Sequence, residues 1–178
     1  MAADPDVGRV YLCEDRLQRW ARAGRAVLVD GRLVSVEPEH DFTDLASVRL
    51  FCTLTCLELG LPPVRVRLRR GETKSHYRPA GPTEPPDRAE IALASWGAAR
   101  LVVLHELAHH VTACQTRQHP GGAEPSHGPL FRASLVALLR HLALPRQADE
   151  LHRLFTGAGL PLAPGGQRSA PRSREATG

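Results

Sequence analysis

The sequence contains few aromatic residues, few cysteines and no long hydrophobic run. Aromatic residues make up 4% of the 178 positions, and the four cysteines are too few and too irregularly spaced for a disulfide framework. No stretch approaches about 18 consecutive apolar residues, and no basic segment followed by an apolar one opens the chain, so neither a membrane-spanning helix nor a secretory signal is indicated. We therefore expect a soluble, cytoplasmic protein whose cysteines are reduced core residues.

Lysine is almost absent, since Lys74 is the only lysine among 23 basic residues. The net charge is +4 and the isoelectric point is about 9.2, but the arginines are scattered along the chain rather than gathered in one block. Dispersed positive charge of this kind is weak support for a nucleic-acid partner. Apolar residues at 42% and charged residues at 24% are close to globular averages, which excludes wholesale disorder.

Hydrophobic periodicity predicts a small α+β domain over residues 9–160. Strict alternation from Val64 to Arg69 predicts a half-buried strand, and Asp30-Gly31 is typical of a type I′ hairpin turn. The result is an N-terminal helix, a short mixed or antiparallel sheet, and a central buried helix followed by C-terminal helices. The expected helices are 9–23, 41–58, 98–114, 128–142 and 147–155, the expected strands are 26–29, 32–36, 64–69 and 90–96, and residues 1–8 and 163–178 are expected to be disordered tails.

Two segments rich in glycine and proline, 71–89 and 115–126, are predicted to be loops without regular structure. The helix at 98–114 is apolar nearly all round, so we expect it to be central and buried. The strand before it, at 90–95, is expected to lie at the edge of the sheet, where an extended peptide adds by main-chain hydrogen bonds. The two loops would then form the rims of a cleft.

The central helix contains His105-Glu-Leu-Ala-His109, an HExxH motif. Because successive residues turn by about 100° around a helix, the two histidines lie about 40° apart on one face, one turn from each other. Both imidazoles can therefore reach a single metal ion, with Glu106 beside them as the carboxylate that takes a proton from a metal-bound water molecule. A divalent cation would also compensate the cost of burying these polar groups in an apolar helix.

A catalytic zinc ion needs a third protein ligand. The extended pattern HExxHxxGxxH is excluded, because positions 112 and 115 hold threonine and glutamine. We favour His127, which follows a loop containing Pro120-Gly-Gly122 and opens a new amphipathic helix, so that the chain can return to the first two histidines. His119, Glu124 and Glu150 are the alternatives.

Other chemically competent side chains are expected to have ordinary roles. His110 lies about 100° around the helix from His109, so we expect it to pack or to support a ligand rather than to bind the metal. His76 and Tyr77 could donate a hydrogen bond to a developing oxyanion, although ordinary loop residues are the favoured interpretation. Cys52 and Cys56 lie four residues apart on one expected helix, and Cys13 and Cys114 lie on two others. Structural zinc sites usually use closely spaced cysteine knuckles instead, which argues against such a site here.

The combination of HELxH on a helix, a loop, and a His-Gly-x-x-Phe segment resembles the single-domain zincins of the SprT-like and WLM kind. The matching residues are His105-Glu-Leu-Ala-His109 and His127-Gly-Pro-Leu-Phe131. The segments VYLCEDRL, VRVRLRRG, Ser75-His-Tyr77, LVVLHELAHH and HGPLF also look like those of a family of small, uncharacterised metallohydrolases of actinobacteria. This resemblance extends over about residues 9–160.

The resemblance implies a zinc-dependent hydrolase, specifically a peptidase acting on a peptide or protein, with Glu106 as general base. It implies one Zn²⁺ per chain, held by His105, His109 and His127. The sequence has no Cys-rich zinc ribbon of the kind that follows the catalytic domain in SprT-like proteases, so their nucleic-acid-linked roles do not transfer directly. Two other hypotheses stay open: a zinc-stabilised binding or regulatory protein without turnover, and a protease acting on DNA-associated proteins.

Overall fold

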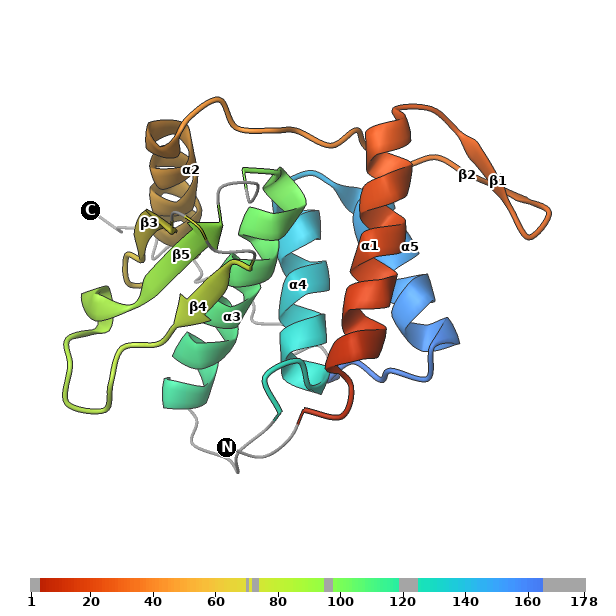
Figure 1. The fold of residues 1–178 in the computed structure, drawn as a ribbon. Helices are drawn as coiled ribbons and strands as arrows, with labels where there is room; N and C mark the ends of the chain where they lie inside the picture. Colours follow the sequence, from red (N-terminus) through yellow and green to blue (C-terminus); the bar gives the residue numbers. More distant parts are fainter. Residues whose placement is uncertain (1–3, 70, 72–73, 95–97, 119–124, 165–178) are drawn as a thin grey trace, which may run out of the picture.

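The computed structural model describes residues 4–69, 71, 74–94, 98–118 and 125–164 of the chain. Within them, five α-helices and five short strands form an α+β fold, as the sequence predicts (Figure 1). The elements are α1 (Val7–Ala23), β1 (Val27–Val29), β2 (Arg32–Val34), α2 (Leu45–Glu58), β3 (Arg65–Arg69), β4 (His76–Arg78), a 3₁₀ turn η1 (Pro86–Arg88), β5 (Glu90–Ala94), α3 (Arg100–Gln118), α4 (Pro129–His141) and α5 (Pro145–Gly157).

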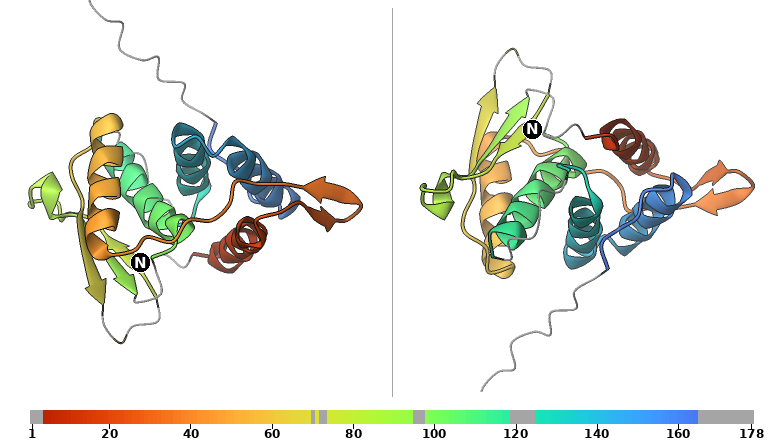
Figure 2. Two further views of the ribbon diagram at one scale, coloured as in Figure 1. Left: turned by 90° about the horizontal axis from the view of Figure 1, so that it is seen from above. Right: turned by 90° about the horizontal axis from the view of Figure 1, so that it is seen from below.

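The predicted hairpin is the antiparallel pair β1 and β2, which projects from the body next to α1 and α5 (Figures 1 and 2). Its turn consists of Asp30 and Gly31, whose φ angles are 48° and 76°. Positive φ at both central positions is the requirement of a type I′ turn, so the prediction from the dipeptide is confirmed.

The second sheet has the order β3-β5-β4, with β5 parallel to β3 and antiparallel to β4. The expectation that 90–95 forms an edge strand is therefore wrong, because β5 is the central strand. Ile91 to Ala94 are all buried, as a strand covered on both faces requires. The prediction of an irregular loop over 71–89 is also wrong, since that segment contains β4 and η1 between its prolines and glycines.

Helix α3 lies between the sheet and α4, and its contacts with β4, β5 and α4 make it the central element that its apolar sequence predicts (Figures 1 and 2). It continues to Gln118, so residues 115–118 are helical rather than part of the expected loop. The buried side chains of α1 to α5 and of β3 and β5 form one hydrophobic cluster. No described helix, α3 included, has both the length and the apolar character needed to cross a membrane.

The two ends of the predicted domain need correction. Helix α1 begins at Val7, and the residues just before it make side-chain contacts described below, so the expected disordered tail is wrong for residues 4–8. At the other end, the N–H of Ala163 donates a hydrogen bond of 2.9 Å to the carbonyl of Pro129, which places the start of the second predicted tail against α4. Residues 1–3 and 165–178 lie outside the described residues.

Candidate metal centre

Helix α3 carries His105 and His109 on one face, one turn apart. Their Nε2 atoms are 3.2 Å from each other, and their ring centroids are 4.8 Å apart. His105 is nearly buried, with 8% of its surface exposed. The HExxH spacing therefore directs two imidazoles toward one point, as helix geometry predicts.

His127 reaches the same point from the turn that precedes α4. Its Nε2 atom lies 3.3 Å from Nε2 of His105, and the three histidines offer nitrogens that all lie within 4.8 Å of one another. The backbone reverses here because Gly128 caps α4 in an extended conformation and Pro129 occupies its first turn. Of the residues considered as a third ligand, the structure brings His127 to the pair on α3.

The two spacings between the nitrogen of His105 and those of His109 and His127 fit a shared metal ion. Zinc–nitrogen distances of about 2.0–2.1 Å in a tetrahedral site place two ligand nitrogens about 3.4 Å apart, close to the 3.2 and 3.3 Å found between the imidazoles. Burial lowers the pKa of His109 to about 2, and the neighbouring His105 and His127 add to the effect. A neutral imidazole is the form that binds a cation, so this shift favours metal binding by His109. Burial also opposes the charged form of His105, but the carboxylate of Glu14 raises the pKa of that imidazole overall. Together the three histidines form a group that could hold a metal ion.

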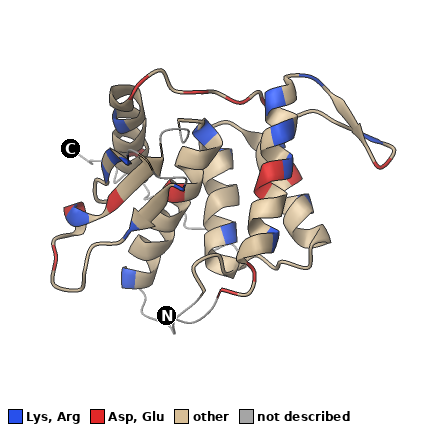
Figure 3. Cartoon of the chain, in the orientation of Figure 1, with Lys and Arg blue, Asp and Glu red and all other residues tan. Residues whose placement is uncertain are grey.

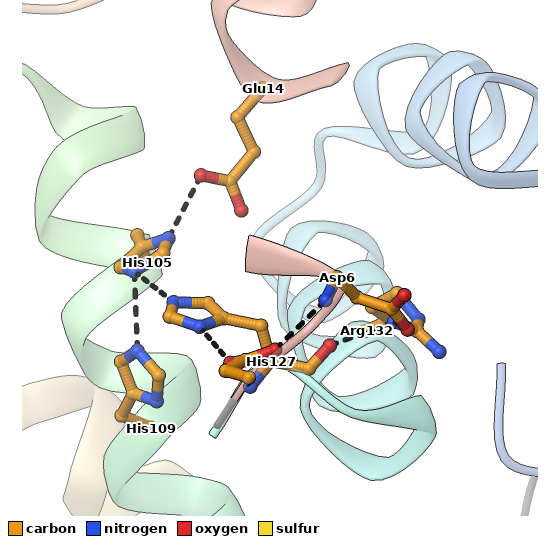
Figure 4. A network of polar contacts seen from close by, with 7 residues as sticks. Asp6, Glu14, His105, His109, His127 and Arg132 are labelled. Carbon is orange, nitrogen blue, oxygen red and sulfur yellow. Dashed lines mark hydrogen bonds and ion pairs between the residues drawn. The ribbon is translucent and has the colours of Figure 1, made fainter. Parts of the chain in front are cut away.

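Two carboxylates that could not be identified from the sequence lie behind the histidines, and Figure 4 shows one of them, Glu14. Glu14 on α1 places Oε2 2.8 Å from Nδ1 of His105. Asp4, just before α1, places Oδ2 2.7 Å from Nδ1 of His127 and accepts a second hydrogen bond of 2.8 Å from the backbone N–H of the same residue. These pairs are separated by 91 and 123 positions in the chain, so no local spacing could have indicated them.

The three histidines open onto a cavity of about 610 Å³ between β4, α3 and the turn of His127. A second cavity of about 350 Å³ adjoins it along α1. Tyr11 borders both, with its ring stacked over that of His105 at a centroid distance of 5.5 Å and edge-on to His127 at 5.3 Å. Tyr11 was not singled out from the sequence either, because it lies off the apolar helix face that Val10, Cys13 and Leu17 form.

Glu106 borders both cavities, although only 4% of its surface is exposed. Burial raises the pKa of its carboxyl group to about 7. A carboxyl group in this range can take up and release a proton near neutral pH, which is the property that acid–base catalysis requires.

His110 points away from the three histidines, as its position on the helix predicts. It is buried, with Nε2 2.8 Å from the carbonyl of Pro62 and Nδ1 3.1 Å from the hydroxyl of Tyr77. The Tyr77 hydroxyl is thus bonded to His110, while the Tyr77 ring lies parallel to that of His109. His76 lies on β4 with Nδ1 2.9 Å from Nη1 of Arg69.

The remaining candidates do not join the site. Glu150 lies on α5, where both of its carboxylate oxygens accept hydrogen bonds from Arg32, at 2.6 and 2.5 Å. His119 and Glu124 lie outside the described residues. Burial raises the pKa of Cys52 to about 12 and that of Cys56 to about 11, so both are protonated thiols. Within the described part of the chain, the cysteines belong to no group that could hold an ion.

Comparisons with protein-family models, with curated proteins and with solved structures found no match to this chain.

Proposed function

We propose that this protein is a zinc-dependent hydrolase, specifically a metallopeptidase. The observation that carries the proposal is the position of Glu106, whose side chain borders the same cavity as three convergent imidazoles. A structural zinc site is closed by four protein ligands and has no use for a carboxylate beside an open position. The resemblance of the HExxH and HGxxF segments to SprT-like and WLM zincins supports the same function.

The chain's own residues would divide the chemistry between binding and proton transfer. Zinc held by the three histidines would supply Lewis-acid chemistry by polarising the scissile carbonyl and acidifying a water molecule. Glu106 would accept the proton of the attacking water and pass it to the leaving amine. Glu106 borders the same cavity as the three imidazoles, which is where this proton transfer would take place.

The substrate would lie in the larger cavity. Its wall is formed on one side by His76 and Tyr77 of β4 and on another by Tyr11 of α1, with the histidines at its base. A volume of about 610 Å³ lies within the range of small-ligand sites and accommodates a few residues of an extended peptide.

The alternative of a zinc-stabilised binding protein is the weaker one, since it leaves the buried carboxyl group of Glu106 without a role. A protease specific for DNA-associated proteins is also less well supported. Figure 3 shows Lys and Arg spread over the helices and strands and mixed with acidic residues, rather than gathered on one element.

Metal content and hydrolysis together test the proposal. Elemental analysis of chain purified without chelators or metal-affinity resin should find about one zinc per molecule in the wild type and in Glu106→Gln, and little in His127→Ala. Hydrolysis of casein and of a mixed fluorogenic peptide library should fall by at least about 100-fold in Glu106→Gln, because the general base is lost.

Glu58→Gln, an exposed change on α2, serves as the matched control and should behave as the wild type. A wild-type chain that takes up no zinc when zinc is offered would remove the proposal. Equal hydrolysis by the wild type and Glu106→Gln would remove the role of Glu106.

A further inference from the structure

The segment that precedes and begins α1, residues 4–14, contacts the candidate metal centre through two acidic side chains. Asp4 and Glu14 are largely buried, with 15% and 19% of their side chains exposed. Each carboxylate accepts a hydrogen bond from the Nδ1–H of one histidine. Asp4 accepts from His127, and Glu14 accepts from His105. Because little water reaches these carboxylates, the hydrogen bonds face little competition from solvent.

These contacts decide which imidazole nitrogen can bind a cation. An ionised carboxylate only accepts hydrogen bonds, so Nδ1 of His105 and of His127 must carry the proton. Each Nε2 atom then keeps its lone pair, and the two Nε2 atoms face each other at 3.3 Å. Two lone pairs at this distance repel each other unless a cation lies between them. The carboxylates therefore hold the imidazoles in an arrangement whose repulsion a metal ion would remove.

We propose that residues 4–14 are part of the metal centre, with Asp4 and Glu14 as positioning residues that fix His127 and His105 and thereby raise the affinity for a divalent cation. This inference rests on the metal site of the proposed function but is independent of hydrolysis. His109 differs from the other two histidines, because no described carboxylate contacts it and its ring lies against Tyr77 instead.

The segment has a second anchor that does not involve the two carboxylates. Arg132 on α4 is 1% exposed, and its Nη1 atom donates to Oδ2 of Asp6 at 3.0 Å and to the backbone carbonyl of His127 at 2.8 Å (Figure 4). The same guanidinium donates from Nε to the carbonyl of Pro161. Arg132 therefore ties the N-terminal segment to the turn of His127, so that a neutral residue in place of Asp4 or Glu14 should leave α1 docked.

The affinity of the full chain for zinc tests this proposal. Competition with a chromophoric chelator should show that Asp4→Asn and Glu14→Gln each weaken zinc binding by about 10- to 100-fold. Asp15→Asn is the matched control, because Asp15 is next to Glu14 but exposed, and it should bind zinc as the wild type does. Thermal unfolding of each chelator-treated variant should still show the cooperative transition of a folded chain, so that a loss of zinc affinity reports on the imidazoles and not on unfolding.

Unchanged zinc affinity in both variants, with a wild type that binds zinc, would overturn the proposal while leaving the proposed function intact. Should a variant fail to fold, long-range ¹⁵N–¹H NMR of the zinc-loaded wild type decides instead. Protonated Nδ1 and zinc-bound Nε2 on His105 and His127 are expected, and the reverse assignment would overturn the proposal. A wild type that binds zinc but hydrolyses nothing would refute the proposed function alone.

Discussion

Two glutamates in the segment between β2 and α2 have carboxyl groups whose pKa values are shifted in opposite directions. Burial would raise the pKa of Glu37, but hydrogen bonds from the backbone N–H groups of Arg146 and Gln147, at 3.1 and 2.8 Å, lower it below the usual value. Burial raises the pKa of Glu39, whose Oε2 atom has no hydrogen-bond partner within the described residues. The backbone at the start of α5 therefore compensates the burial of the Glu37 carboxylate but not that of Glu39.

We expect Glu37→Gln and Glu39→Gln to change the free energy of unfolding in opposite directions. A lowered pKa stabilises the fold above the usual carboxyl pKa, so Glu37→Gln should cost about 1 kcal/mol at pH 7. That cost should shrink as the pH falls through the range where Glu37 takes up its proton. A raised pKa means that the ionised carboxylate of Glu39 destabilises the fold. Glu39→Gln should therefore be more stable than the wild type at pH 7 and equally stable near pH 4, where the wild-type carboxyl group is neutral in the folded chain. Urea unfolding at several pH values checks both signs, and a shift of both variants in one direction would contradict the argument.

At the scale of an element, α4 ends in a left-handed residue that is not glycine. Ala143 has a φ of 57°, and its N–H donates to the carbonyl of Arg140 while the N–H of Leu144 donates to that of Leu139. This pattern is a helix-terminating motif in which glycine is preferred, because a Cβ atom is strained at positive φ. Leu144, 5% exposed, then enters the hydrophobic core, so the motif sets the direction of the chain into α5.

Ala143→Gly should stabilise the protein by about 0.5–1 kcal/mol, because relief of the left-handed strain exceeds the added entropy of the unfolded chain. Ala137→Gly, at an exposed position inside the same helix, should destabilise it by about 1 kcal/mol. Opposite shifts of the urea midpoint are the expected result. Destabilisation by both substitutions would show that the terminal strain is smaller than the entropic cost of glycine.

At the scale of the whole molecule, the candidate metal centre joins parts of the chain that are distant in sequence. Its imidazoles come from α3 and from the turn before α4, and the carboxylates behind them come from α1 and the residues before it. Helix α1 packs on α5, and α4 packs on both α3 and α5 (Figure 2). A cation held by the three histidines would link α3 to the turn before α4, and the carboxylates of Asp4 and Glu14 would connect it to the N-terminal segment. Binding of a metal ion at this place would therefore add to the global stability of the fold.

Zinc should raise the melting temperature of the protein, and a chelator should reverse the effect. With free zinc at about 100 times the dissociation constant, the gain is about 2.7 kcal/mol, which corresponds to about 5–10 °C for a chain of this size. Differential scanning calorimetry measures the shift. His127→Ala is the control, and an equal zinc-dependent shift in that variant would show that zinc stabilises the protein elsewhere.

The sequence by itself determined the features that depend on neighbours along the chain. The relative position of His105 and His109 follows from helix geometry, and the turn at Asp30 and Gly31 follows from the φ angles that glycine and aspartate tolerate. The apolar character of α3 similarly predicted its central place, because such a helix has no face that favours water. The return of His127 could be anticipated from the reversing loop before it, although its distance from the other two histidines could not.

Only the tertiary structure decided which strand is central and which carboxylates support the histidines. β5 was expected at an edge because three residues of β4, set among prolines and glycines, carry too little periodicity to reveal a partner strand. Asp4 and Glu14 are ordinary acidic residues in the sequence, and they contact His127 and His105 only because the fold docks α1 on α5 and so brings them to α3 and the turn before α4. Contacts between residues so far apart arise from the packing of a whole core, which no local pattern encodes.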